Sequence, residues 1–258
     1  MSPARLMTAI SLAAMLLLAA APPAAAAGET CYLPDTDLAA WKEIFRKDDI
    51  VVYAMPAPDS DIMAFRATGT LRAPIDQVME VLRQVEIAEQ WMPDIVEKNT
   101  IEEISDLEAV TYSINKLPWP FAGRELILNN ALRFDAKTRY LVVDVYSVKR
   151  EDIAPKEGTV RAVMHCGQTR LRPADGLRTD MDIILFVDPK GAIPAWMANF
   201  AQRRMPYNFL RGLEKKAATT HYPLRPAFRR LLNQLVSLME TETAPGTPAA
   251  PATQARAD

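Results

Sequence analysis

The sequence has few of the residues from which metal sites and catalytic sites are usually built. It contains two cysteines and two histidines among 258 residues, and they do not stand at the spacing of metal ligands. It also lacks the Gly-x-Ser-x-Gly elbow of hydrolases and a glycine-rich phosphate loop. His165 falls within a predicted strand and His221 follows a predicted helix, so we expect structural or surface roles for both. No metal and no cofactor are predicted.

The chain has no large excess of either charge. Its 30 basic and 32 acidic residues give a formal net charge of −2. A nucleic-acid-binding surface would require a basic patch and a high isoelectric point, so nucleic acid is not predicted as a partner. The carboxylates Asp180 and Asp182 share one face of a predicted strand, the face expected to meet solvent. These absences favour a protein that is not an enzyme.

Residues 1–27 have the pattern of a secretory signal peptide: a basic residue at Arg5, an apolar run, and an alanine-rich end. The apolar run is shorter than the roughly 20 residues that span a bilayer. We therefore predict export to the periplasm or the extracellular space. There, Cys31 and Cys166 can form a disulfide worth about 4 to 5 kcal/mol in the chain-entropy model. The alternative, a buried Cys166 and a free Cys31, stays open.

The first part of the remaining chain predicts helices and a hairpin. Residues 37–47 have apolar side chains at helical spacing behind an aspartate N-cap, which predicts a helix. Residues 50–55 and 63–71 predict two strands joined by turn-forming residues. Pro74 then precedes an apolar stripe over residues 75–85 that is typical of an amphipathic helix.

From residue 95 to residue 187 the pattern changes to strands with short connections. The clearest strands are around 110–114 and over 126–134, 141–148, 161–171 and 177–187. Successive strands without intervening helices predict an antiparallel meander.

Two helices are predicted after the strands. A long amphipathic helix spans 194–220, and Pro206 interrupts it. A second helix spans 226–239. The Pro, Ala and Thr content from Thr241 onward predicts a disordered tail.

Several motifs stand in a characteristic order. An alternating strand runs into D-P-K-G-A-I-P-A-W at residues 188–196, ahead of the long helix. Upstream are Trp41, Trp91, the segment P-W-P-F-A-G-R-E at residues 118–125, and T-V-R at residues 159–161. This order resembles the START (StAR-related lipid transfer) domain family. The resemblance implies an α+β helix-grip fold, in which a curved antiparallel sheet is closed by a long C-terminal helix around a hydrophobic cavity.

The resemblance also sets the predicted domains and limits the ligand. We expect a signal peptide at 1–27, a START-like lipid-binding domain at 28–222, an additional helix at 223–240, and a disordered tail at 241–258. Arg124-Glu125 stands where the family usually has Arg-Asp, which keeps the charge. Asn129-Asn130 stands where the cholesterol-binding members place a cavity arginine, so a sterol ligand is not implied.

The predicted function is to bind, and to carry, one hydrophobic lipid-like molecule. The predicted lining residues are Arg124, Asn130, Met181, Ile183, Leu185, Met197, Ala201 and Met205. Two alternatives stay open: the apolar space is filled as an ordinary core, or Arg124 braces the loop before its strand through an ion pair. The C-terminal helix is the expected lid, and residues 149–158 are the expected neighbouring flap.

The partners expected are a lipid or other hydrophobic small molecule and, transiently, a membrane, and the chain is expected to be a monomer. The alternative function is a helix-grip enzyme of the aromatase/cyclase type. Such an enzyme should show an acid/base pair that faces the cavity.

Overall fold

The structure, a computed structural model, describes residues 38–57 and 59–243 and is built on one sheet of ten strands. The strands are β1 (Lys42–Lys47), β2 (Ile50–Pro56), β3 (Met63–Leu71), β4 (Ile95–Ser105), β5 (Glu108–Asn115), β6 (Gly123–Asp135), β7 (Tyr140–Ser147), β8 (Thr159–Arg161), β9 (Val163–Pro173) and β10 (Thr179–Asp188). The α-helices are α1 (Ile75–Arg83), α2 (Ala195–Gln202), α3 (Met205–Ala218) and α4 (Pro226–Thr243). Two 3₁₀ helices lie at Leu38–Ala40 and Val85–Gln90.

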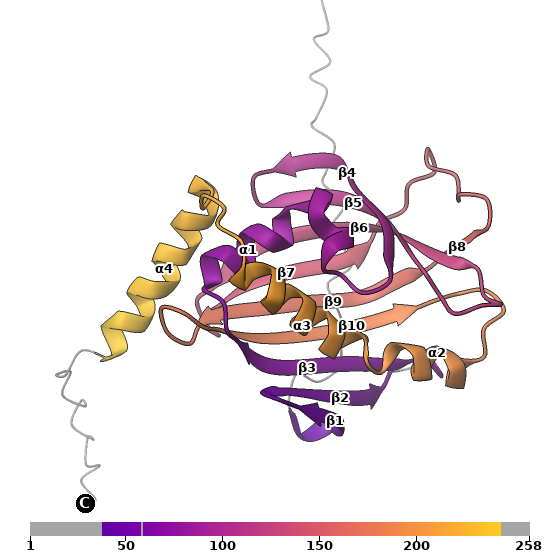
Figure 1. Cartoon of the computed structure of the whole chain (residues 1–258), viewed down its shortest axis with the longest axis horizontal. Helices are drawn as coiled ribbons and strands as arrows, with labels where there is room; N and C mark the ends of the chain where they lie inside the picture. Colours follow the sequence, from indigo (N-terminus) through magenta and orange to yellow (C-terminus); the bar gives the residue numbers. More distant parts are fainter. Residues whose placement is uncertain (1–37, 58, 244–258) are drawn as a thin grey trace, which may run out of the picture.

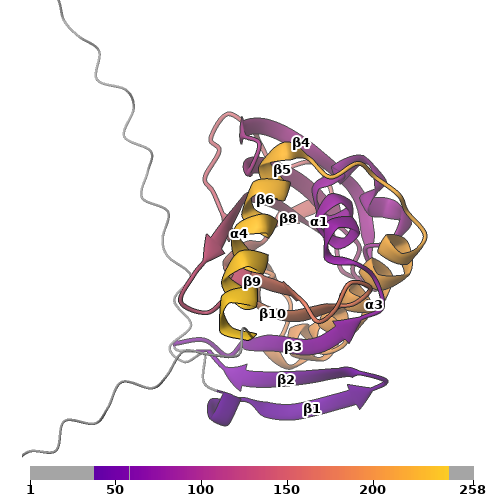
Figure 2. The same ribbon diagram turned by 90° about the vertical axis from the view of Figure 1, so that its left-hand side faces the viewer.

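The strand order across the sheet is β1-β2-β3-β10-β9-β7-β6-β5-β4, with β8 beside β6. Along this path every neighbouring pair is antiparallel, and only the short β8 pairs in parallel. The pairing of β10 with β3 joins the N-terminal hairpins to the later meander. The sheet curls around α1 and α3 without closing into a barrel (Figure 2). The predicted α+β helix-grip fold is confirmed.

The main core lies where α1 and α3 pack on the concave face of the sheet. Val78 of α1 and Leu210 of α3 are fully buried together with Leu141, Leu171 and Ile183 from the strands. These strand residues lie on one face because side chains alternate along a strand. Burial of each such side chain contributes about 1.5 to 3 kcal/mol, so this end of the molecule is firmly closed.

The helix predicted over residues 37–47 is wrong. Beyond the 3₁₀ turn, these residues form β1, which pairs with β2 through a tight turn at Asp48 and Asp49. Asp48 has a φ of 52°, a conformation that Asp tolerates and that suits a hairpin turn. Pairing with the branched residues of β2 outweighs the weak helical pattern of a short segment.

The long helix predicted over residues 194–220 is two helices, separated at Arg203 and Arg204. Pro206 stands in the first turn of α3, where its missing N–H does no harm. Within a continuous helix it would remove a hydrogen bond and clash with the preceding turn. The predicted interruption at Pro206 is therefore a complete break.

The C-terminal helix predicted beyond residue 222 is α4, and it extends to Thr243, into the segment predicted to be disordered. The predicted signal peptide, Cys31, and residues 244–258 of the predicted tail lie outside the described residues. Among the helices of the described part of the chain, none is both long and apolar enough to cross a membrane.

Candidate ligand-binding cavity

A cavity of about 630 Å³ lies between the concave face of the sheet and the helices. Alternate residues of β5, β6, β7, β9 and β10 face it, because every second side chain of a strand points to the same side. Its strand wall is mainly aliphatic: Leu126, Leu128, Leu132, Val143, Val145 and Leu185. This volume falls in the range of small-molecule sites. The alternative that side chains fill the space completely is wrong.

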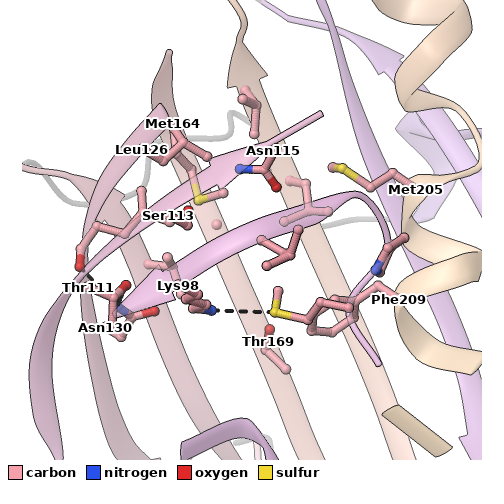
Figure 3. A pocket seen from close by; sticks show the side chains of 18 of the residues that line it. Lys98, Thr111, Ser113, Asn115, Leu126, Asn130, Met164, Thr169, Met205 and Phe209 are labelled. Atoms are coloured by element: carbon pink, nitrogen blue, oxygen red, sulfur yellow. Dashed lines mark hydrogen bonds between the residues drawn. The ribbon is translucent and has the colours of Figure 1, made fainter. Parts of the chain in front are cut away.

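All four α-helices contribute to the lining. α1 supplies Met79 and Leu82, α2 supplies Ala198, Ala201 and Gln202, α3 supplies Met205 and Phe209, and α4 supplies Phe228. Met205 and Phe209 stand one helical turn apart and face the cavity together (Figure 3). Trp91, which follows the second 3₁₀ helix, packs against Phe209 with a ring separation of 5.3 Å.

The residues predicted from the sequence divide into two groups. Arg124, Asn130, Leu185, Ala201 and Met205 line the cavity.

Met181, Ile183 and Met197 do not line it. Met181 and Ile183 share the strand face of Leu185, but they lie where α1 and α3 pack directly on the sheet. Met197 points away from the cavity, because the face of α2 that lines the cavity consists of Ala198, Ala201 and Gln202, at positions i, i+3 and i+4.

Arg124 is buried and braces the turn that leads into α2. Its Nε donates to the carbonyl oxygen of Pro189 at 2.6 Å, and Nη2 donates to that of Lys190 at 3.1 Å. Nη1 donates to its own loop, at the carbonyl of Ala122. Burial lowers the pKa of Arg124. The bracing role is thus real, but it uses backbone carbonyls in place of the predicted ion pair.

A polar strip crosses the aliphatic wall on β4, β5 and β6. The Asn130 side-chain nitrogen donates to Thr111 Oγ1 at 3.1 Å and to backbone carbonyls. Ser113, two residues along β5 on the same face, lies beside Leu126 of β6. Figure 3 shows these side chains gathered on one side of the cavity. The strip gives the otherwise apolar lining a set of hydrogen-bonding groups.

Lys98 extends from β4 into this strip and was missed by sequence reasoning (Figure 3). It pairs with Ser113 on the neighbouring strand, and its ammonium nitrogen lies 3.5 Å from Met92 Sδ. Burial lowers the pKa of Lys98 to about 8. The other charged residues of the lining are Arg83, Asp94, Glu108, Lys116 and Arg124.

The outer face of the same strands holds the loop at residues 148–158 in place. Glu125 is fully buried and accepts hydrogen bonds from Tyr112 Oη, from Arg161 Nε and from the backbone N–H of Lys156. Burial alone would raise the pKa of Glu125, but these hydrogen bonds and the charge of Arg161 lower it overall. The predicted flap is therefore anchored at Lys156.

The sequence matches the model of the START domain over residues 24–222. The chain belongs to the START family. The START domain thus covers the sheet and helices α1 to α3, whereas α4 follows the matched region although its Phe228 reaches the cavity.

Similar proteins include phosphatidylcholine transfer protein of Bos taurus, 26% identical over 182 residues, with 69% of this chain and 84% of that protein covered. An uncharacterized protein of Pseudomonas aeruginosa is 25% identical over 180 residues, 69% of this chain and 86% of its own length.

Solved START structures have the same fold. A STAR-related lipid transfer protein from Xanthomonas axonopodis is 28% identical with a TM-score of 0.61, covering 69% of this chain and 98% of that fragment. Human STARD10, at 19% identity, shares the fold alone, with a TM-score of 0.63 over 80% of this chain and 83% of its own.

One end of the START cavity is bordered by exposed aromatic residues. Trp196 and Phe200 of α2 are 68% and 64% exposed, and Trp119, beside the lining residue Pro118, is 92% exposed. Arg203 lies over the Phe200 ring, 4.8 Å from its centre. Exposed aromatic rings beside a basic side chain are typical of surfaces that meet membrane interfaces, and the two Trp rings are also amphipathic.

Cys166 lies in a separate buried cluster with Trp41 and Phe186, on the face opposite the cavity. It is engaged in a disulfide. Because Cys31 lies outside the described residues, the pairing of Cys31 with Cys166 stays a prediction.

Proposed function

We propose that this START domain carries one lipid-like molecule in its cavity and exchanges it through movement of α2. The observation on which this depends is the mainly aliphatic cavity of about 630 Å³. Burying roughly 400 Å² of hydrocarbon at about 25 cal/mol per Å² gives on the order of 10 kcal/mol before association costs. The similarity to phosphatidylcholine transfer protein supports the same class of ligand.

The contacts of α2 support its role as the moving part. Ala198 is its buried residue, whereas α3 buries Leu210, Leu213 and Ala217 against the core. Polar contacts hold α2 at the cavity edge: Asn199 bonds the backbone of residues 61 and 63, and Gln202 donates to the carbonyl of Val187. Breaking such bonds costs about 1 kcal/mol each, which thermal motion supplies readily.

The exposed Trp196, Phe200 and Trp119 support a proposal that this end of the domain touches a membrane during exchange. Rings at the head-group level would bring the cavity edge to the lipid chains. The pattern of residues 1–27 supports export, which would place this exchange at an envelope membrane.

A carrier is favoured over an aromatase/cyclase-type enzyme by the chemistry of the lining. An acid/base enzyme needs two groups within reach of one another. Lys98 bonds only the thioether of Met92, and no carboxylate in the described part of the chain pairs with it. Among the described residues, Lys98 is therefore an amine without the carboxylate partner that an acid/base pair requires.

Native mass spectrometry of the full chain from its own host, followed by uptake of fluorescent phospholipids and fatty acids, tests the carrier proposal. We expect a bound lipid or stoichiometric uptake. Leu185→Trp should reduce uptake because Leu185 lines the cavity, and Met197→Trp, outside the lining, should not. Empty protein that takes up none of these probes contradicts the proposal.

A further inference from the structure

Lys98 is directed into the cavity by the geometry of β4. Its neighbour Glu97 points to the outer face, where its carboxylate accepts from Lys156 Nζ at 2.9 Å. Lys98 lies opposite Ser113 of β5, a residue of the cavity wall. The acidic residue next to Lys98 in the sequence is thus occupied on the other side of the sheet and does not neutralise it.

Within the cavity the ammonium group has an incomplete set of partners. An ammonium has three donors, and the contact it makes is with Met92 Sδ at 3.5 Å, a weak acceptor. No carboxylate of the described residues forms an ion pair with it. Of the two acidic lining residues, Glu108 accepts instead from Asn129, and Asp94 is exposed and forms no ion pair with Lys98. Lys98 is partly buried, and a partly desolvated charge without a counter-ion is costly, so an added anion would stabilise it.

Hydroxyl groups beside Lys98 fit the same ligand chemistry. Ser113 lies directly across from Lys98, and Thr111 follows on the same strand face. Each hydroxyl has an O–H that can donate to an anionic oxygen. The amine is still mostly protonated at neutral pH, because burial lowers its pKa only to about 8. The surrounding wall is aliphatic, which suits the hydrocarbon part of the same molecule.

We propose that Lys98 is the counter-ion of an acidic amphiphile, whose carboxylate or phosphate oxygen is buried against Lys98 Nζ and the Ser113 hydroxyl with its hydrocarbon in the aliphatic part of the cavity. This inference rests on the proposed carrier function and adds ligand selectivity to it. Charge-assisted hydrogen bonds are about twice as strong as neutral ones, and removing the charge should remove the preference for anionic ligands.

Competition binding on delipidated full-length protein tests the proposal with ligands matched in hydrocarbon. Oleate is compared with oleyl alcohol, and dioleoyl phosphatidic acid with dioleoylglycerol, so that carboxylate and phosphate are separate arms. We expect at least one anionic ligand to bind tenfold or more tightly than its neutral match. Lys98→Met should abolish that preference while neutral binding stays within threefold, and Lys98→Arg should retain part of it.

Lys137→Met is the matched control, because Lys137 is an exposed lysine in the β6–β7 turn and its removal changes the net charge equally. Thermal melts confirm that each variant is folded. A wild-type preference that survives in Lys98→Met overturns the proposal, and so does equal binding of anionic and neutral ligands by the wild type. If none of the four ligands binds, this proposal fails, and the uptake of fluorescent phospholipids decides separately whether the carrier function fails with it.

Discussion

The two ends of the cavity are closed in different ways. At one end, α4 packs beside α1, β6 and β7, and at the other end α2 lies by the start of β3 and the end of β10 (Figure 1). Phe228 and Leu235 of α4 are almost fully buried. On α2, by contrast, Trp196 and Phe200 are largely exposed. The α4 end is closed by buried contacts, and the weaker contacts of the α2 end are consistent with the proposal that α2 moves.

The polar contacts follow the same division. Glu80 of α1 is buried and accepts from both the backbone and the guanidinium of Arg225, just before α4. Gln77, one turn earlier, exchanges hydrogen bonds with the backbone of Tyr222. At the α2 end, Asn199 makes its bonds at a partly exposed edge. Local stability in a protein is unequal, and segments that move to admit a ligand are generally drawn from its weaker parts.

The largest expected effect on stability comes from removing the contacts between Glu80 of α1 and Arg225, just before α4. Glu80→Ala leaves the Arg225 backbone N–H and guanidinium without their acceptor, and the loss of one partner of a buried pair is strongly destabilising. We expect the free energy of unfolding to fall by about 3 kcal/mol, because Arg225 is half-buried and regains some water. Urea unfolding followed by circular dichroism measures the change.

Asp49→Ala is the control for Glu80→Ala. Asp49 pairs with Arg72 and both side chains are exposed, so its loss should cost less than about 1 kcal/mol. Equal costs at the two positions would show that the contact at α4 is no stronger than a surface ion pair.

The next effect compares one aromatic residue at each end. Phe228→Ala removes a buried ring and should lower the free energy of unfolding by about 3 kcal/mol. Phe200→Ala removes an exposed ring and should change it by less than about 0.5 kcal/mol. Binding to vesicles should show the reverse order, with the larger loss for Phe200→Ala. A vesicle affinity that Phe200→Ala leaves unchanged would remove Phe200 from the membrane surface.

The fold could be predicted from the sequence wherever apolar residues recur at a regular spacing. β6, β7, β9 and β10 alternate over many residues, and the START resemblance supplied their order around the cavity. β4 could not be recognised in the same way because its pairing with β5 shifts register at three places, between Ile95 and Glu97, Thr100 and Glu102, and Glu103 and Ser105. Each shift reverses the inward and outward sides of the strand.

The same irregularity explains why the candidate site was only partly predicted. Whether Lys98 or Glu97 faces inward depends on a bulge that no local pattern marks. Met181 and Ile183 lie on the same inward face of β10 as Leu185. The sequence does not show, however, at which point along β10 the helices pack on the sheet, because that depends on the tertiary structure. Arg124 and Asn130 were found because the family motif fixes their place before and within β6.

The environment of Lys98, in the cavity between the two ends, can be tested by measuring the stability of the ligand-free protein. Burial lowers the pKa of Lys98 from 10.5 to about 8, so a charged Lys98 destabilises the empty fold below pH 8. Lys98→Met should raise the free energy of unfolding at pH 7 by about 1 to 3 kcal/mol, since one pKa unit is worth about 1.4 kcal/mol. The wild type binds fewer protons folded than unfolded between pH 8 and 10.5, so it gains stability there and the difference from the variant disappears.

Chemical denaturation of delipidated protein at pH 7 and pH 10.5 measures this difference. Lys137→Met, at an exposed position, should follow the wild type at both values. A pH-independent difference between Lys98→Met and the wild type would mean that the interior hydrates the amine fully, and that the closed ends do not keep water out.

A small change in stability, and the most direct test of whether α2 moves, is expected at Asn199. Asn199→Ala removes the bonds to the backbone of residues 61 and 63, and should lower the free energy of unfolding by about 1 kcal/mol. If those bonds hold α2 closed, their loss raises the population of the open state, and ligand should dissociate about fivefold faster in stopped-flow transfer to acceptor vesicles. Asn208→Ala, an exposed asparagine of α3, leaves α2 untouched and should exchange ligand at the wild-type rate. The opposite result would be an unchanged dissociation rate in Asn199→Ala and a faster rate in Phe228→Ala. It would mean that the ligand leaves at the α4 end and that the α2 end stays closed.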